Sequence, residues 1–139
     1  MGPFLVKRLA TFIATLAVAS VVVFVVLELL PGNAVNELAV AHGQLGNVYN
    51  TAGDLRRALE HWRESIRCCE TAGDLYHAAT ARYNVGRALA QAGRLADGLD
   101  YARAALRNYE TYGAGAAADV EKTRGLIAAI EEKMGKGKG

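Results

Sequence analysis

The sequence of 139 residues has little proline, little cysteine, few aromatic side chains and almost no net charge. It contains two prolines and two cysteines, 7% of its residues are aromatic, and 16 basic side chains against 14 acidic ones leave a net charge of +2. Nucleic-acid binding requires a cluster of basic residues, and here the basic and acidic residues are interleaved along the sequence. We therefore predict no nucleic-acid partner.

The few cysteines and histidines also argue against a metal centre or a reactive site. Cys68 and Cys69 are neighbours on a predicted helix, where adjacent side chains point about 100° apart and cannot form a mutual disulfide. We expect His42, His61 and His77 to lie too far apart in the folded chain to share a metal. No Ser/His/Asp set, carboxylate pair or phosphate loop occurs, so we predict no cofactor, no metal, no catalytic residue and no enzyme activity.

Charge is absent from one long stretch, residues 9–27. At about 1.5 Å per residue this stretch would form a helix of roughly 28 Å, close to the hydrocarbon thickness of a bilayer. Lys7 and Arg8 precede it, and the next basic residue is Arg56. The positive-inside bias predicts a single-pass membrane protein with a cytoplasmic amino terminus and the remainder on the far side. The unpaired cysteines favour the opposite side, because they suit a reducing compartment.

Other interpretations of this segment are a cleaved signal peptide and a buried core helix. Residues 17–19 (Ala-Val-Ala) resemble a cleavage site, but the apolar run continues past it, which favours an uncleaved anchor. A core helix would show a polar face, and none is present over five turns. Because Pro31 and Gly32 are helix breakers, we predict that the anchor ends there and spans 1–32.

This segment also resembles the amino-terminal end of dipeptide/oligopeptide-type ABC transporter permeases. The matching features are a basic pair, one long apolar helix and a closing turn: Phe4, Lys7, Arg8, Phe24 and Leu29-Leu30-Pro31-Gly32. Asn33-Ala34 stands where that family usually has Asp-Pro. The resemblance covers about a quarter of the chain, and none of the later permease helices follows, so transport activity is not implied.

The rest of the chain repeats itself with an offset of forty residues. The segment 45–55 returns as 85–95, with the Gly-x-x-x-x-x-Ala-Gly pattern kept, and the correspondence continues to Gly73 and Gly113. Apolar positions at helical spacing, broken at 53–54, 73–74, 93–94 and 113–115, predict five helices over 36–52, 55–72, 75–92, 95–112 and 117–134. Such short connections force consecutive helices to pack antiparallel. Units of this kind complete their cores by stacking.

These residues resemble the tetratricopeptide repeat in a form of about forty residues. Leu45-Gly46-x-x-Tyr49 matches the pattern of the first helix of the repeat. Ala58 and Gly98 are the small residues at which the second helix of each repeat crosses the first, and Trp62 is the large aromatic of the second helix. The second repeat departs from the pattern, with Ala102 at the Trp62 position. We predict an all-α, antiparallel helix-pair solenoid of about two and a half repeats over 33–134, preceded by one transmembrane helix and followed by a flexible tail, 135–139.

The resemblance implies that a protein or peptide binds the concave surface made by the first helix of each pair. The predicted partner-binding residues on that surface are Asn47, Asn50, Tyr83, Asn84, Arg87, Gln91 and Arg124. Three of them, Asn47, Asn84 and Arg124, coincide with positions that clamp a peptide carboxylate in chaperone-binding members of the family. Gly43 and Val120 occupy the two lysine positions, so the clamp is incomplete.

The sequence therefore predicts a non-catalytic, membrane-anchored scaffold for a protein or peptide. Two alternatives stay open: a component of a peptide-type ABC transport system that associates through its permease-like helix, and a fragment of a larger soluble repeat regulator. The sequence does not predict the oligomeric state.

Overall fold

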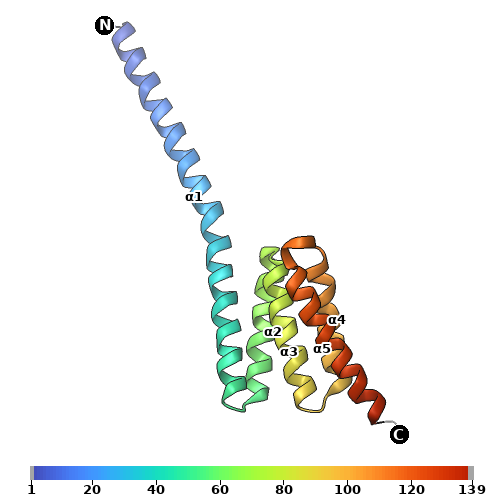
Figure 1. Cartoon of the computed structure of the whole chain (residues 1–139). Helices are drawn as coiled ribbons and strands as arrows, with labels where there is room; N and C mark the ends of the chain where they lie inside the picture. The colour runs from blue at the N-terminus through green and yellow to red at the C-terminus, as the bar shows by residue number, and fades with distance from the viewer. Residues whose placement is uncertain (1, 138–139) are drawn as a thin grey trace. The chain divides into compact units, whose positions relative to one another are not determined.

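A computed structural model describes residues 2–137, apart from the side chains of 27–33. Its helices, in chain order, are α1 (Gly2–Thr51), α2 (Leu55–Ala72), α3 (Leu75–Gln91), α4 (Leu95–Glu110), the 3-10 helix η1 (Gly113–Ala116) and α5 (Ala117–Lys136) (Figure 1). The described part of the chain has no strand, so the fold is all-α as predicted. It divides into two compact units, Met1–Ala34 and Val35–Gly139, which we describe separately.

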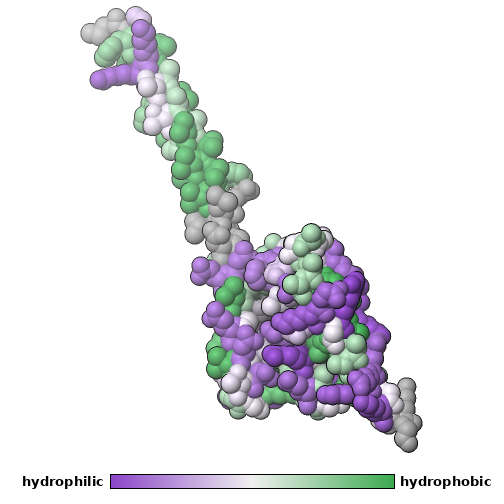
Figure 2. All heavy atoms as spheres, viewed as in Figure 1, coloured by the Kyte–Doolittle hydropathy of each residue, from purple (hydrophilic) through white to green (hydrophobic). Residues whose placement is uncertain are grey.

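The first unit is helical and carries one segment, Gly2–Val26, that is long and apolar enough to cross a membrane. None of its most apolar window is buried in the structure, which is not the environment of a core helix. Hydrophobic side chains gather along this segment in Figure 2. The hydroxyls of Thr11 and Thr15 donate to the carbonyls of Lys7 and Thr11, at 2.5 and 2.7 Å, so these polar groups are satisfied within the helix.

The predicted helix end at Pro31-Gly32 is wrong, because α1 continues without a break to Thr51. A proline removes one backbone donor and its ring crowds the carbonyl four residues earlier, which costs roughly 3 kcal/mol in an isolated helix. Here the helix continues on both sides of Pro31, and the residues from Ala39 onward are held by packing against α2. The helix therefore stays continuous although Pro31 cannot donate a backbone hydrogen bond.

In the second unit, the carboxyl-terminal part of α1 and the helices α2 to α5 follow each other antiparallel, with the predicted bounds nearly unchanged. Asp54 and Asp74 cap α2 and α3, accepting from the backbone N–H groups of Arg57 and His77 at 3.0 and 3.1 Å. A glycine with positive φ follows the end of each of the helices α1 to α4: Gly53 at 82°, Gly73 at 74°, Gly93 at 81° and Gly113 at 56°.

The core of the first helix pair is built around Trp62, whose side chain has no exposed surface. It packs with Leu59, Val85 and Leu89, and Tyr49 covers the cluster from α1. The indole ring lies directly over Gly46, where an added Cβ would come within 2.4 Å of the Trp62 ring. Glycine is therefore required at position 46 because the aromatic ring occupies the place of its side chain.

The second helix pair, α3 and α4, has no aromatic ring at the position equivalent to Trp62. Ala102 replaces tryptophan, and α3 and α4 approach so closely that a Cβ on Gly86 would lie 2.9 Å from the Gly98 carbonyl oxygen. A Cβ on Gly98 would lie 2.8 Å from the Gly86 carbonyl oxygen. The departure from the repeat pattern at position 102 thus accompanies a closer approach of the two backbones.

A group of three tyrosines joins α3, the end of α4 and α5. Tyr76 packs edge-on against Tyr109 and Tyr112, with ring centroids 5.4 and 5.5 Å apart. The Tyr76 hydroxyl donates to Asp119 on α5 at 2.6 Å, and the Tyr109 hydroxyl shares a hydrogen bond with Thr80 at 2.9 Å. These contacts fix α5, the half repeat, against the array.

Candidate functional site

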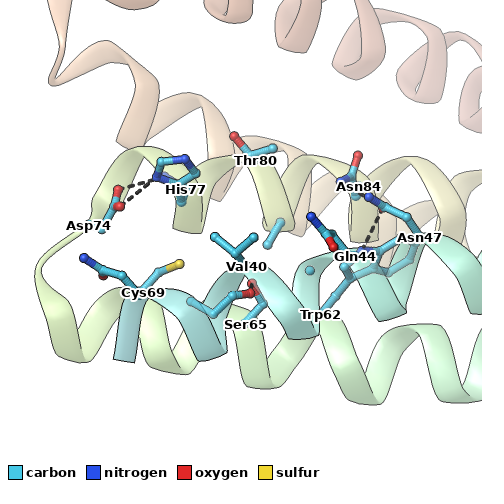
Figure 3. Close-up of a pocket in the computed structure, with 14 residues that line it drawn as sticks. Val40, Gln44, Asn47, Trp62, Ser65, Cys69, Asp74, His77, Thr80 and Asn84 are labelled. Carbon is cyan, nitrogen blue, oxygen red and sulfur yellow. Dashed lines mark hydrogen bonds and ion pairs between the residues drawn. The ribbon is translucent and has the colours of Figure 1, made fainter. Parts of the chain in front are cut away.

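A groove runs between α1 and α3, with α2 as its floor (Figure 3). Its cavity volume is about 370 Å³. Apolar side chains cover most of the surface, and neutral polar groups project from both walls. The lining residues of this first groove are Asn36, Ala39, Val40, Gly43, Gln44 and Asn47 from α1, Trp62, Ser65 and Cys69 from α2, and Asp74, His77, Thr80, Ala81 and Asn84 from the start and body of α3.

At one end of the first groove, Asn47 is held by two donors. Its Oδ1 accepts from Trp62 Nε1 at 3.1 Å and from Asn84 Nδ2 at 3.4 Å. The Nδ2 group of Asn47 and the Oδ1 of Asn84 make no hydrogen bond to any described residue. One amide donor and one amide acceptor are thus presented together at the groove.

Polar groups of α2 and α3 line the rest of the first groove. The Ser65 hydroxyl, on the floor, donates to the Ala39 carbonyl oxygen at 2.7 Å. Burial raises the pKa of the neighbouring Cys69 thiol, so this group is a neutral part of the surface near neutral pH. Asp74 and His77 form an exposed pair at 2.7 Å between the carboxylate Oδ2 and the imidazole Nδ1. The first groove therefore carries little net charge.

A second groove of about 310 Å³ lies between α3 and α5, over Tyr109 of α4. His77, Thr80 and Asn84 line both grooves, so the two share one wall, the α3 helix. Lys122 of α5 enters the second groove with its ammonium 4.7 Å from the centre of the Tyr83 ring. Together the two grooves make one surface that crosses the first helix of each pair.

The structure brings together three of the predicted partner-binding residues and leaves the other four outside. Asn47 and Asn84 line the first groove, and Tyr83 and Asn84 line the second. Arg124 instead forms ion pairs with Glu121 and with Glu110 of α4, at 3.0 and 3.2 Å. The remaining predicted residues that line neither groove are Asn50, Arg87 and Gln91.

Sequence reasoning missed several groove residues from the second half of the surface. His77, Thr80 and Lys122 were not predicted, although each stands three or four residues from a lining position on the same helix. Helical spacing from Asn84 and Tyr83 was the available signal for the two residues of α3.

The expectation that the histidines lie far apart is wrong for one pair. The Nδ1 atoms of His42 and His61 are 2.9 Å apart, and Tyr49 stacks on His61 with ring centroids separated by 5.3 Å. A helix–turn–helix folds positions 42 and 61 onto the same level, which a comparison along one helix does not reveal. Within residues 2–137, no group of three His, Cys, Asp or Glu side chains is placed to hold a metal ion.

Antiparallel helix pairs that repeat every forty residues and share a grooved face define a helical repeat protein. The family model for the tetratricopeptide repeat matches residues 37–111, more than half of the chain, and the chain belongs to this family. No curated protein matches the sequence. The repeats indicate a scaffold for protein–protein interaction, in a family whose members are non-catalytic.

Proposed function

We propose that this chain is a membrane-anchored, non-catalytic scaffold that holds an extended segment of a partner protein in the grooves between α1, α3 and α5. The observation that carries the proposal is the pair of amides at the junction of the two grooves. Asn47 Nδ2 and Asn84 Oδ1 offer one donor and one acceptor, the complement of a peptide carbonyl and N–H. The apolar lining of the first groove suits small or aliphatic side chains of the same segment.

The charge distribution favours the interior of a peptide over its carboxyl terminus. Arg124, the one basic clamp position that the chain retains, already binds two carboxylates, Glu110 and Glu121. Gly43 supplies no cation, and a Cβ there would already approach Ser65 Oγ to 3.3 Å. Lys122 and Asp119 place one charge of each sign along the second groove. An internal segment with side chains of both signs fits this arrangement better than a free carboxylate.

The anchor is the second part of the proposal, and residues 9–27 carry it. All but the last residue of this segment lies within Gly2–Val26, which passes the length and hydropathy requirement for a membrane span. Extraction of membranes with alkaline carbonate tests this directly: an inserted helix stays in the pellet, whereas a fragment of a soluble regulator moves to the supernatant. Co-purification with permease subunits from detergent would instead favour the transport-component alternative.

The groove is tested with paired variants of the full chain. A partner is captured on wild-type protein, identified by mass spectrometry, and its affinity is then measured. Gln44→Ala and Asn84→Ala each remove polar groups from the groove and should each weaken binding about fivefold, since a hydrogen bond contributes about 1 kcal/mol. Arg63→Ala, on the exposed face of α2 away from both grooves, is the control and should bind as wild type. Equal losses in all three variants would contradict the groove assignment.

A further inference from the structure

Two histidines face each other across the contact between α1 and α2. His42 of α1 and His61 of α2 both belong to the repeat unit, and both residues are half-buried. Their Nδ1 atoms lie 2.9 Å apart, and when both rings are neutral one nitrogen donates its proton to the other. One reason for predicting no metal was the expected distance between the histidines, and the position of this pair removes that reason.

The separation of the two nitrogens matches that of two ligands bound at right angles to one metal ion. Bonds from imidazole nitrogen to a metal such as zinc are about 2.0–2.1 Å long, and two such bonds at a right angle place the nitrogens about 2.8–3.0 Å apart. A tetrahedral angle would place them about 3.3–3.4 Å apart. The observed 2.9 Å therefore fits the right-angled coordination that Cu²⁺ and Ni²⁺ adopt in square-planar and tetragonal sites.

Neighbouring side chains hold the His61 ring in place. The Tyr49 ring stacks on it, with centroids 5.3 Å apart and an angle of 3° between the planes. The Arg57 guanidinium lies 5.5 Å from the centre of the Tyr49 ring and pairs with Asp54 at 3.5 Å, which offsets part of its charge. Among the described residues His42 makes no other side-chain hydrogen bond, so its ring can turn toward a metal that His61 already faces. A ligand that is oriented before binding loses less conformational entropy.

We propose that His42 and His61 form a two-histidine site for Cu²⁺, and more weakly for Ni²⁺, that joins the carboxyl-terminal part of α1 to α2. The metal replaces the proton between the rings: the donor ring loses its proton at Nδ1 and gains one at Nε2 from water, and each Nδ1 gives its lone pair to the metal. Water takes the remaining coordination positions, because no group of three His, Cys, Asp or Glu within residues 2–137 is placed to hold a metal. Divalent ions bind such nitrogen sites most tightly when they are Cu²⁺.

The third histidine offers a poorer set of ligands and serves as the matched control. His77 has a side chain that is 60% exposed, and its Nδ1 pairs with the carboxylate of Asp74 three residues earlier. This pair supplies one imidazole where the site of His42 and His61 supplies two. A metal ion held by any surface histidine would bind at His77 as well as at the proposed site.

The site is tested on the full chain without an affinity tag, in detergent micelles, with Cu²⁺ and Ni²⁺ salts as the probes. Titration calorimetry with Ni²⁺ measures the affinity, and electron paramagnetic resonance of bound Cu²⁺ counts the nitrogen ligands. His42→Gln and His61→Gln each leave one imidazole and should weaken Ni²⁺ binding about tenfold or more. His77→Gln should bind Ni²⁺ as the wild type does. Circular dichroism of each variant checks that the helices are intact.

We expect one tightly bound Cu²⁺ per chain, with splitting from two nitrogens in the wild type that is lost in His42→Gln and His61→Gln. Added Cu²⁺ should also broaden the amide resonances of the wild type around positions 42 and 61, a measurement that does not depend on the folding of a variant. No saturable binding would show that the pair is a structural hydrogen bond only. Broadening centred on His77, or equal losses in all three variants, would show an adventitious surface ion only. Either result overturns the proposal.

A stability measurement tests the same site from the side of folding. An ion that binds the folded chain and joins two helices should raise the midpoint of thermal unfolding, so Ni²⁺ should raise it for the wild type and for His77→Gln but not for His61→Gln. Equal shifts in all three proteins would contradict the assignment. His42 and His61 line neither groove, so failure of this inference leaves the proposed function unaffected.

Discussion

The Nε1 of Trp62 lies 3.1 Å from the Oδ1 of Asn47 and donates a hydrogen bond to it, linking a large, fully buried side chain of the core to the wall of the groove. The same amide oxygen accepts from Asn84 of the next repeat. The side chain that stabilises the first helix pair therefore also orients the two amides that we assign to partner binding.

Replacing Trp62 should lower the stability of the repeats by an amount that depends on the replacement. Trp62→Ala removes a fully buried aromatic side chain and should lower the free energy of unfolding by about 3–5 kcal/mol. Trp62→Phe keeps most of the volume and loses the hydrogen bond to Asn47, at a smaller cost in stability. Urea denaturation of residues 35–139 measures both. A wild-type midpoint for Trp62→Ala would contradict the repeat register on which the core assignment rests.

Gly46→Ala should be strongly destabilising, because its Cβ would lie 2.4 Å from the Trp62 ring. Combined with Trp62→Ala, the same substitution should cost less than it does alone, since the ring that it meets is gone. Gly125→Ala is the matched control on α5: nothing lies within 4 Å of its added Cβ, and we expect a gain of about 0.5–1 kcal/mol. Additive effects of the Gly46 and Trp62 substitutions would show that the two sites do not contact each other.

Arg124→Ala should leave partner affinity unchanged, in contrast to Asn84→Ala. The Arg124 guanidinium binds Glu110 and Glu121 and lines neither groove. Isothermal titration with the identified partner measures the difference between the two variants. A loss of affinity in Arg124→Ala comparable to that in Asn84→Ala would restore the carboxylate clamp as the mode of recognition.

The tyrosine contacts predict a loss of stability in alkali. The hydrogen bond from Tyr76 to Asp119 raises the Tyr76 pKa above its ordinary value of 10.0, and burial raises the Tyr109 pKa from the same value. A folded-state pKa above the unfolded one gives a contribution that is complete below about pH 10 and declines as the pH rises through that value. Thermal melts of Tyr76→Phe and Tyr109→Phe should therefore fall less steeply between about pH 9 and 11 than wild type. Parallel pH profiles for all three proteins would contradict this assignment.

The charge next to the proposed anchor predicts its orientation. Lys7 and Arg8 precede the apolar segment and no basic residue follows it before Arg56, so the amino terminus should be cytoplasmic and the repeats on the far side. Protease added to intact spheroplasts should digest the repeats and spare the short amino-terminal tail. Repeats that remain protected until the membrane is opened would reverse the orientation.

The repeat fold could be predicted from the sequence because its signals are local. Asp54 and Asp74 stand at N-cap positions, and each turn has a glycine with positive φ, so the helix bounds follow from short-range patterns. The continuation of α1 through Pro31 could not be predicted in this way. Whether a proline ends a helix depends on how firmly its neighbours are held, and that is a tertiary property.

The candidate site was only partly predictable for a related reason. Asn47 and Asn84 were predicted because the resemblance to the tetratricopeptide repeat places both on the concave surface. The diversion of Arg124 to Glu110 depends on where the end of α4 lies relative to α5, and the contact of His42 with His61 depends on the superposition of two antiparallel helices. Both are fixed by the packing angle between helices, which no residue pattern along one helix records.

The turn glycines at 53, 73, 93 and 113 are separated by equal intervals of twenty residues, with positive φ at each of them. Because the intervals are equal, the turns between the helices of the array are equivalent. A duplicate of residues 54–93 inserted after Gly93 would begin and end at the same kind of turn. Its helices would continue the alternation between helices that line the grooves and helices on the outer side of the array. The array can therefore lengthen by gene duplication in units of forty residues, and each added unit extends the grooved surface without redesign of the existing core.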